Sequence, residues 1–172
     1  AEAWKDYFKP LHISPRLAVV PSWENVDMPS HVHVIRVDPG SAFGTGQHAT
    51  TALCLRALDL HQTERGLGSV VDMGCGTGIL GIGAHLLGAE RITMIDNDPL
   101  AITVAKNNLD ELGLSAHFDV HCFDQPIDNQ RFDTVVANIL APVLIQHAEA
   151  LSKMVASKGC LLLSGILTIQ IA

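Results

Sequence analysis

A run of alternating glycines near the middle of the chain constrains its fold more than any other feature. Residues 70–78 read Val-Val-Asp-Met-Gly-Cys-Gly-Thr-Gly, and the apolar, β-branched start predicts a short buried strand over 69–73. The glycines then interrupt the strand, and residues 79–87 are apolar with a helical period. Glycine is needed where the backbone turns sharply or approaches a ligand closely. A strand, a tight glycine turn and a helix are typical of a nucleotide-type cofactor site in an α/β sheet.

The spacing of the glycines distinguishes between cofactors. A dinucleotide fingerprint would place glycines at 74, 76 and 79, but position 79 is Ile79. Asp72 precedes Gly74 by two residues, and a carboxylate there would repel a pyrophosphate. The same carboxylate would attract the sulfonium and α-amino groups of S-adenosylmethionine. The pattern therefore favours S-adenosylmethionine, and a nicotinamide-dependent oxidoreductase is the alternative.

A second carboxylate is expected at the same site. Residues 91–96 predict a strand that ends at Asp96, which lies 22 residues after Gly74. A carboxylate in this position can accept hydrogen bonds from both hydroxyls of a ribose. Because a glycine turn alone is common in surface loops, the prediction depends on Asp72, Gly74, Gly76 and Asp96 together.

The remainder of the chain alternates between strand and helix patterns. Strands are predicted over 17–20, 31–37, 91–96, 116–122, 132–137 and 160–164. Helices are predicted over 52–60, with Leu53, Ala57 and Leu60 on one stripe, over 99–112, and from 142 to about 157. The alternation indicates right-handed βαβ units. The predicted fold is therefore α/β: a mostly parallel, Rossmann-like sheet with helices on both faces, preceded by an N-terminal strand pair.

Asn138 is expected to lie beside the glycine turn. In such a sheet, ligands bind beyond the carboxyl ends of the strands, where the strand order reverses. The glycine turn follows the first strand of the alternating region, and Asn138 follows the fourth. If these two strands are neighbours, both loops face one crevice, with Asp96 and Asp124 on the same rim.

Residues 38–51 form a second unusual stretch, rich in glycine and polar side chains. One interpretation is an ordinary loop in which Thr50 or Thr51 caps the following helix. The other is a flap over a ligand, with Phe43 as an apolar lid. A phosphate-binding P-loop is excluded because no lysine follows the glycines.

Composition limits the class of protein further. A chain of 172 residues with 48% apolar residues suits a folded domain, and its net charge of −7 permits a basic partner while arguing against nucleic-acid coating. Four widely spaced cysteines without a CxxC motif predict free thiols in a cytoplasmic protein. His31 and His33 share a strand face without a third ligand, so no metal site is predicted. No segment suggests membrane association.

Several of these motifs resemble a known family. Residues 72–78, Asp96 and the Asn-Ile-Leu-Ala segment over 138–141 look like a class I S-adenosylmethionine-dependent methyltransferase. More narrowly, that segment together with Phe-Gly-Thr-Gly-Gln-His-Ala-Thr-Thr over 43–51 and Ser-Gly-Ile-Leu over 164–167 resembles the PrmA family. PrmA enzymes methylate the large-subunit ribosomal protein L11. The resemblance covers nearly the whole chain.

The resemblance implies a protein N-methyltransferase whose substrates are lysine side chains and an N-terminal amine of a basic ribosomal protein, with no direct DNA binding. It implies cofactor contacts at Thr51, Gly74, Asp96 and Asn138. It also implies that residues 1–16 are the end of an interdomain linker and that residues 17–172 are the methyltransferase domain, without the family's N-terminal substrate domain and C-terminal end. The alternative is a cofactor-binding fragment of a methyltransferase with a different protein substrate.

Asn138 is the candidate catalytic residue. Since a sulfonium already makes the methyl group electrophilic, the enzyme's main task is to position the amine, which desolvation helps to deprotonate. We expect the Asn138 amide and a nearby backbone carbonyl to orient the hydrogens of the amine. Methyltransferases of nucleic acids or glutamine amides would show Asn-Pro-Pro-aromatic here, whereas Ile139 and Leu140 stand in place of the prolines. His48 is expected to be structural.

Overall fold

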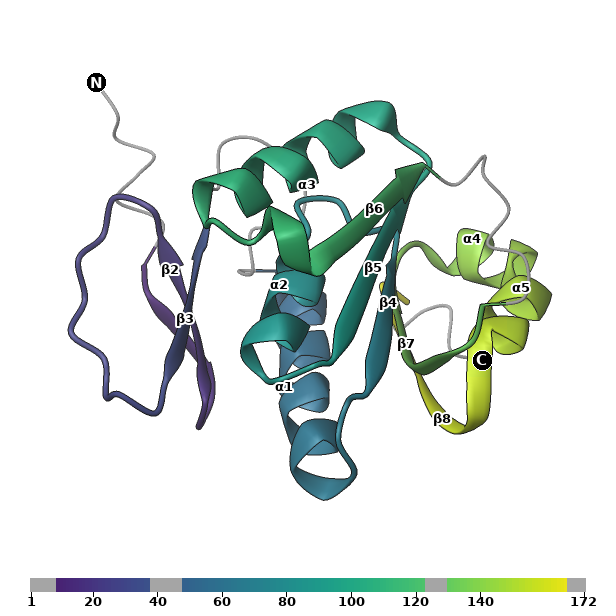
Figure 1. Cartoon of the computed structure of the whole chain (residues 1–172), viewed down its shortest axis with the longest axis horizontal. Helices are drawn as coiled ribbons and strands as arrows, with labels where there is room; N and C mark the ends of the chain where they lie inside the picture. The colour runs from purple at the N-terminus through teal and green to yellow at the C-terminus, as the bar shows by residue number, and fades with distance from the viewer. Residues whose placement is uncertain (1–8, 38–47, 123–129, 167–172) are drawn as a thin grey trace.

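The larger of two sheets contains five parallel strands and lies at the centre of Figure 1. The computed structural model describes residues 9–37, 48–122 and 130–166. The strands of this sheet are β4 (Ser69–Met73), β5 (Arg91–Asp96), β6 (Phe118–Cys122), β7 (Phe132–Asn138) and β8 (Val155–Ser164). Their order is β6-β5-β4-β7-β8, so the strand order reverses between β4 and β7. The two strands are therefore neighbours, which is the condition on which the expected position of Asn138 beside the glycine turn depends.

The register of the sheet brings three strand ends to one level. Met73 of β4 lies opposite Ile95 of β5 on one side and opposite Ala137 of β7 on the other. The residue that follows each of them therefore lies at the same height on the rim of the sheet. These three residues are Gly74, Asp96 and Asn138.

Helices cover both faces of the five-stranded sheet. On one face lie α1 (Ala49–Glu64), α2 (Ile79–Leu86) and α3 (Pro99–Glu111), and on the other lie α4 (Ala141–Gln146) and α5 (Ala148–Met154). A short 3₁₀ turn, η2 (Ser115–His117), precedes β6. Within the described ranges, no helix is long and apolar enough to cross a membrane.

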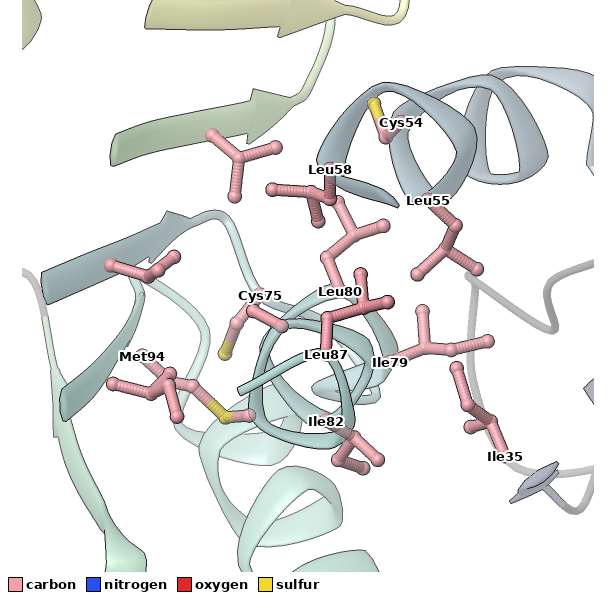
Figure 2. Close-up of a cluster of buried hydrophobic side chains, with 14 of the residues drawn as sticks. Ile35, Cys54, Leu55, Leu58, Cys75, Ile79, Leu80, Ile82, Leu87 and Met94 are labelled. Carbon is pink, nitrogen blue, oxygen red and sulfur yellow. The ribbon is translucent and has the colours of Figure 1, made fainter. Parts of the chain in front are cut away.

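Two apolar clusters hold these layers together. The larger one packs Leu55 and Leu58 of α1 against α2 and reaches Met94 of β5, as Figure 2 shows. The smaller one, on the opposite face, packs Leu144 and Leu151 against β4 and β7. Burying each such side chain contributes about 1.5–3 kcal/mol, so the two clusters fix the sheet between its helices.

A second, three-stranded sheet lies on the outer side of α1 and α2 (Figure 1). It consists of β1 (Leu11–Ser14), β2 (Leu17–Pro21) and β3 (His33–Val37), with β1 antiparallel and β3 parallel to β2. The sequence analysis predicted a strand pair here, and β1 joins it as a third strand. All five residues of β2 are buried.

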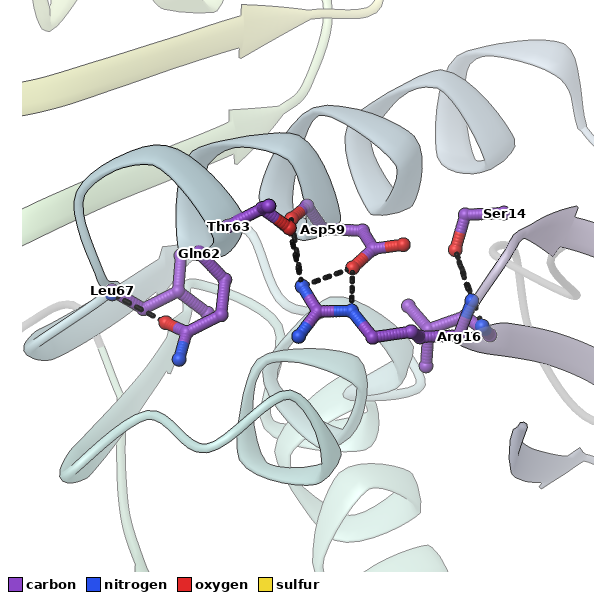
Figure 3. Close-up of polar contacts among 7 residues, drawn as sticks. Ser14, Arg16, Asp59, Gln62, Thr63 and Leu67 are labelled. Carbon is purple, nitrogen blue, oxygen red and sulfur yellow. Dashed lines mark hydrogen bonds and ion pairs between the residues drawn. The ribbon is translucent and has the colours of Figure 1, made fainter. Parts of the chain in front are cut away.

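An arginine fork attaches this small sheet to α1 (Figure 3). Arg16 Nε donates to Asp59 Oδ1 at 2.7 Å, and Arg16 Nη2 donates to the Asp59 backbone oxygen at 3.0 Å and to Thr63 Oγ1 at 2.8 Å. The Asp59 side chain is only 7% exposed, so its charge depends on this partner. Arg56 adds a second link from α1, donating to the Ile13 backbone oxygen at 2.6 Å.

Two helices begin at side-chain caps. Asp98 caps α3 through its Oδ1, which accepts from Leu100 N at 2.9 Å, and Pro99 is the first residue of the helix. The prediction that Thr50 or Thr51 caps α1 is wrong. The cap is His48, whose Nδ1 accepts from Thr50 N at 3.4 Å, so His48 has the structural role expected of it.

Two element predictions need correction. Helix α1 forms, but the predicted stripe faces outward: Leu53 is 58% exposed and Leu60 is 60% exposed, while Leu55 and Leu58 are buried. The helix predicted from 142 to about 157 is instead two short helices that end at Met154, after which β8 begins at Val155. Pairing of Val155 with Phe132 across the sheet outweighs the local helical pattern.

Candidate functional site

The glycine turn after β4 is held by the neighbouring strand. Gly74 N and Cys75 N both donate to the backbone oxygen of Ile95, at 2.7 and 3.0 Å. Gly74, Gly76 and Gly78 have φ values of 72°, 54° and 81°, the left-handed region that favours glycine. The GxGxG spacing is thus explained by backbone conformation at each of the three positions.

Close packing against the segment after β7 is a second reason why position 74 requires glycine. A Cβ atom on this residue would lie 2.3 Å from Ile139 Cγ2. The same Ile139 is also approached from β8, since a Cβ on Gly165 would lie 2.3 Å from the Ile139 backbone oxygen. The ends of β4, β7 and β8 therefore meet around one isoleucine.

Asp96 faces the glycine turn, as its predicted role requires. Its Oδ2 accepts from Gly76 N at 2.9 Å, and its Oδ1 accepts from Asp98 N at 3.0 Å. Both oxygens are therefore held in place by backbone donors. A carboxylate has about four acceptor positions, so Asp96 can accept further hydrogen bonds from a ligand.

Asp72 lies behind the turn, on the face of the sheet covered by α1 and α2. Its side chain is buried, and Oδ2 accepts from Gly81 N at 3.0 Å in the first turn of α2. Because the N-cap residue Gly78 has no side chain, Asp72 caps this helix from the adjacent strand. Its other oxygen, Oδ1, is buried and has no hydrogen-bond partner among the described residues. Burial, together with the nearby Asp96 carboxylate, raises the pKa of Asp72 to about 7, against the lowering effect of the Gly81 hydrogen bond.

Asn138 is joined to α1 across the rim. Its Nδ2 donates to Thr51 Oγ1 at 3.2 Å, a contact between residues separated by 87 positions in the chain. One turn further along α1, burial raises the pKa of the Cys54 thiol, and the hydroxyl of Ser164, which lies close to it at the end of β8, lowers that pKa by a smaller amount. The start of α1 is thus fixed to the ends of both β7 and β8.

The thiols near the rim are not activated nucleophiles. All four cysteines are free, as predicted, and Cys54 and Cys75 are buried. Burial raises the pKa of the Cys75 thiol, and the Asp72 and Asp96 carboxylates raise it further. Within the described ranges, no group of three His, Cys, Asp or Glu side chains is arranged to hold a metal ion.

Comparison with known proteins identifies the family to which this chain belongs. The family model of ribosomal protein L11 methyltransferase (PrmA) matches residues 1–172. The chain belongs to the PrmA family. The ribosomal protein L11 methyltransferase of Desulfotalea psychrophila is 44% identical over 167 residues, which is 97% of this chain and 56% of that protein. That of Azotobacter vinelandii is 46% identical over 169 residues, or 98% of this chain and 56% of that protein.

A crystal structure shares the fold of this PrmA-family chain. The ribosomal protein L11 methylase from Lactobacillus delbrueckii subsp. bulgaricus superimposes with a TM-score of 0.80 at 32% identity, covering 95% of this chain and 83% of that one. The α/β methyltransferase fold is therefore confirmed. This chain spans just over half the length of the curated PrmA relatives described above.

The PrmA-family motifs gather at one rim, with some members outside the described residues. Gly74, Gly76, Asp96 and Asn138 lie at or just after the ends of β4, β5 and β7, and Thr51 in the first turn of α1 is joined to Asn138. Residues 38–47 and Asp124 lie outside the described residues. The sequence analysis did not foresee the central place of Ile139, and only its membership of the family motif could have indicated it.

Proposed function

We propose that this chain is the cofactor-binding domain of an S-adenosylmethionine-dependent protein N-methyltransferase that acts on amines of a ribosomal protein in the cytoplasm. The observation that carries the proposal is the level placement of Gly74, Asp96 and Asn138 where the strand order reverses. Family membership supports the reaction class, and the names of the curated relatives support ribosomal protein L11 as the substrate.

Three features of the rim fit the proposed cofactor. The left-handed glycine turn leaves backbone exposed to an adenosyl group, and Asp96 has free acceptor positions for ribose hydroxyls. The unpartnered Oδ1 of Asp72 fits a positively charged ligand. Ile79, which is 2% exposed within α2, occupies the position where a dinucleotide turn would have glycine, and this argues against nicotinamide cofactors.

Asn138 is the residue that we infer orients the amine. S-adenosylmethionine supplies an electrophilic methyl group when bound. Because Asn138 Nδ2 donates to Thr51, its Oδ1 is directed to a different partner, and we infer that it accepts a hydrogen bond from the substrate amine. Fixing one N–H bond of the amine restricts the direction of its lone pair, which increases the fraction of productive encounters.

The proposed domain comprises residues 17–172, with residues 1–16 as the end of a linker. Strand β1 of that segment is joined to the domain by antiparallel pairing of Leu11 with Val19.

The function can be tested in two steps. A thermal-shift comparison should show stabilisation by S-adenosylmethionine and none by NAD; stabilisation by NAD alone would contradict the cofactor assignment. The full-length protein should then transfer radiolabelled methyl groups from S-adenosylmethionine to purified ribosomal protein L11. If the label instead appears only on other proteins of a ribosome-free extract, the substrate assignment is wrong while the reaction class stands.

A further inference from the structure

Within the described parts of the chain, Asp72 is a buried carboxyl group without a counter-ion. Asp72 is 1% exposed, and its carboxyl group accepts one hydrogen bond from the described residues, from Gly81 N to Oδ2. Among the residues that the structure describes, the ionisable groups acting on it are Cys75 in the turn, Cys54 on α1 and Asp96 on β5. None of these groups can carry a positive charge.

The strands on either side of Asp72 provide no charge either. In the register of the sheet, Asp72 lies opposite Met94 on β5 and opposite Val136 on β7, and both side chains are buried and apolar. The positive end of the α2 dipole and one backbone N–H are therefore the main stabilising influences on an ionised Asp72. A buried charge needs more than this, and burial accordingly raises the pKa of Asp72 to about 7.

We propose that Asp72 is a proton-exchanging counter-ion: it is protonated in a large fraction of free chains and loses its proton when the positively charged end of the methyl donor occupies the crevice. The O–H bond of the carboxyl group breaks, its electron pair stays on the oxygen, and the proton passes to the solvent. This inference rests on the proposed function, because it requires that the chain bind S-adenosylmethionine.

The proposal has a quantitative consequence for binding. If the bound state is fully ionised, ligand binding at pH 7 should release about half a proton per molecule. By the same linkage, the affinity should fall about tenfold between pH 8 and pH 6, because protonated chains must first lose a proton. The positive charge responsible is either the ammonium group, which donor and demethylated product share, or the sulfonium, which only the donor has.

Isothermal titration calorimetry in two buffers of different protonation enthalpy measures this release directly. S-adenosylmethionine should release about half a proton at pH 7. In a parallel titration, equal release with S-adenosylhomocysteine would assign the effect to the ammonium group, and no release would assign it to the sulfonium. Either result supports the counter-ion role. Binding of S-adenosylmethionine without any proton release would overturn it and leave the proposed function intact, whereas no binding at any pH would overturn both.

Variants and a measurement on the free protein complete the test. Asp72→Asn keeps an acceptor for Gly81 N and should abolish the proton release, while Asp133→Asn, at the opposite end of the sheet, should leave it unchanged. Infrared spectra of the free protein at pH 6 should show the carbonyl stretch of a buried protonated carboxyl group, which disappears in Asp72→Asn. A spectrum without this band would overturn the proposal even if the variant failed to fold.

Discussion

Gly74, after β4, packs so closely against Ile139, after β7, that adding a single methyl group at Gly74 should destabilise the fold. We predict that Gly74→Ala lowers the free energy of unfolding by about 2–4 kcal/mol, because left-handed strain adds to a clash with Ile139. Urea denaturation gives the value. Gly113→Ala is the matched control, since Gly113 has a φ of 68° but nothing within 4 Å of the added Cβ. Equal losses in the two variants would show that Ile139 can move away.

Asp96 offers a test of the sugar-binding assignment. Asp96→Ala should weaken S-adenosylmethionine binding by a few kcal/mol through the loss of two charge-assisted hydrogen bonds, as measured by calorimetry. Because Asp96 also accepts from Gly76 N and Asp98 N, thermal unfolding of the free variant should be measured alongside. Unchanged affinity would reject the assignment.

Asn138 and Thr51 should act as a pair. We expect Asn138→Ala to reduce methyl transfer about a hundredfold with a much smaller effect on cofactor affinity, since misplacing the amine costs rate more than binding. Thr51→Val, which removes the hydroxyl partner of Asn138, should lower the rate in the same way, and Thr51→Ser should restore it. Full turnover by Asn138→Ala in single-turnover assays would eliminate its catalytic role.

Single residues differed in how far the sequence could predict their roles. The glycine turn and Asp96 follow from a local pattern, because strand, turn and spacing lie within one βαβ unit. The bond from Asn138 to Thr51 spans 87 positions and could be inferred only through the family. His48 was missed as a helix cap because histidine is not among the usual N-cap residues.

At the scale of elements, the attachment of α1 to the small sheet depends on Arg16. We predict that Arg16→Lys lowers the free energy of unfolding by about 2 kcal/mol, because an ammonium cannot reproduce the fork and Asp59 is left buried with a poorer partner. Chemical denaturation of the variant and the wild type would measure this loss of stability. Lys153→Ala breaks an exposed ion pair with Glu149 and should have little effect, so a similar loss in both variants would contradict the argument.

Predictions of helices and strands failed where the sequence pattern was compatible with two different structures. Helix α1 has apolar side chains on two sides, and periodicity alone does not show which side meets the sheet. The start of β8 follows from pairing with Phe132, which is distant in sequence and invisible to a local pattern. The strand alternation itself was predicted correctly because buried parallel strands have few other interpretations.

For the whole molecule, Asp72 should shape the pH dependence of stability. Its pKa rises from 3.8 in a model peptide to about 7 in the folded chain, so the native state binds more protons than the unfolded state between these values. This contribution therefore destabilises the fold progressively as the pH rises from about 4 to 7, and stays constant above. We expect Asp72→Asn to gain a few kcal/mol relative to wild type between pH 5 and pH 7.5 in urea denaturation. Parallel pH profiles for the two proteins would contradict a raised pKa.

The level register of β4, β5 and β7 also has a consequence for how the molecule is made. A nascent chain that has emerged only as far as β6 already contains Gly74 and Asp96 but has no Asn138, and β4 still exposes the edge that β7 will occupy. The side of the rim that we propose to orient the amine can form only when β7 inserts beside β4. If the proposed roles hold, a growing chain could at most bind the methyl donor before that insertion, and methyl transfer would have to wait until synthesis has passed β7.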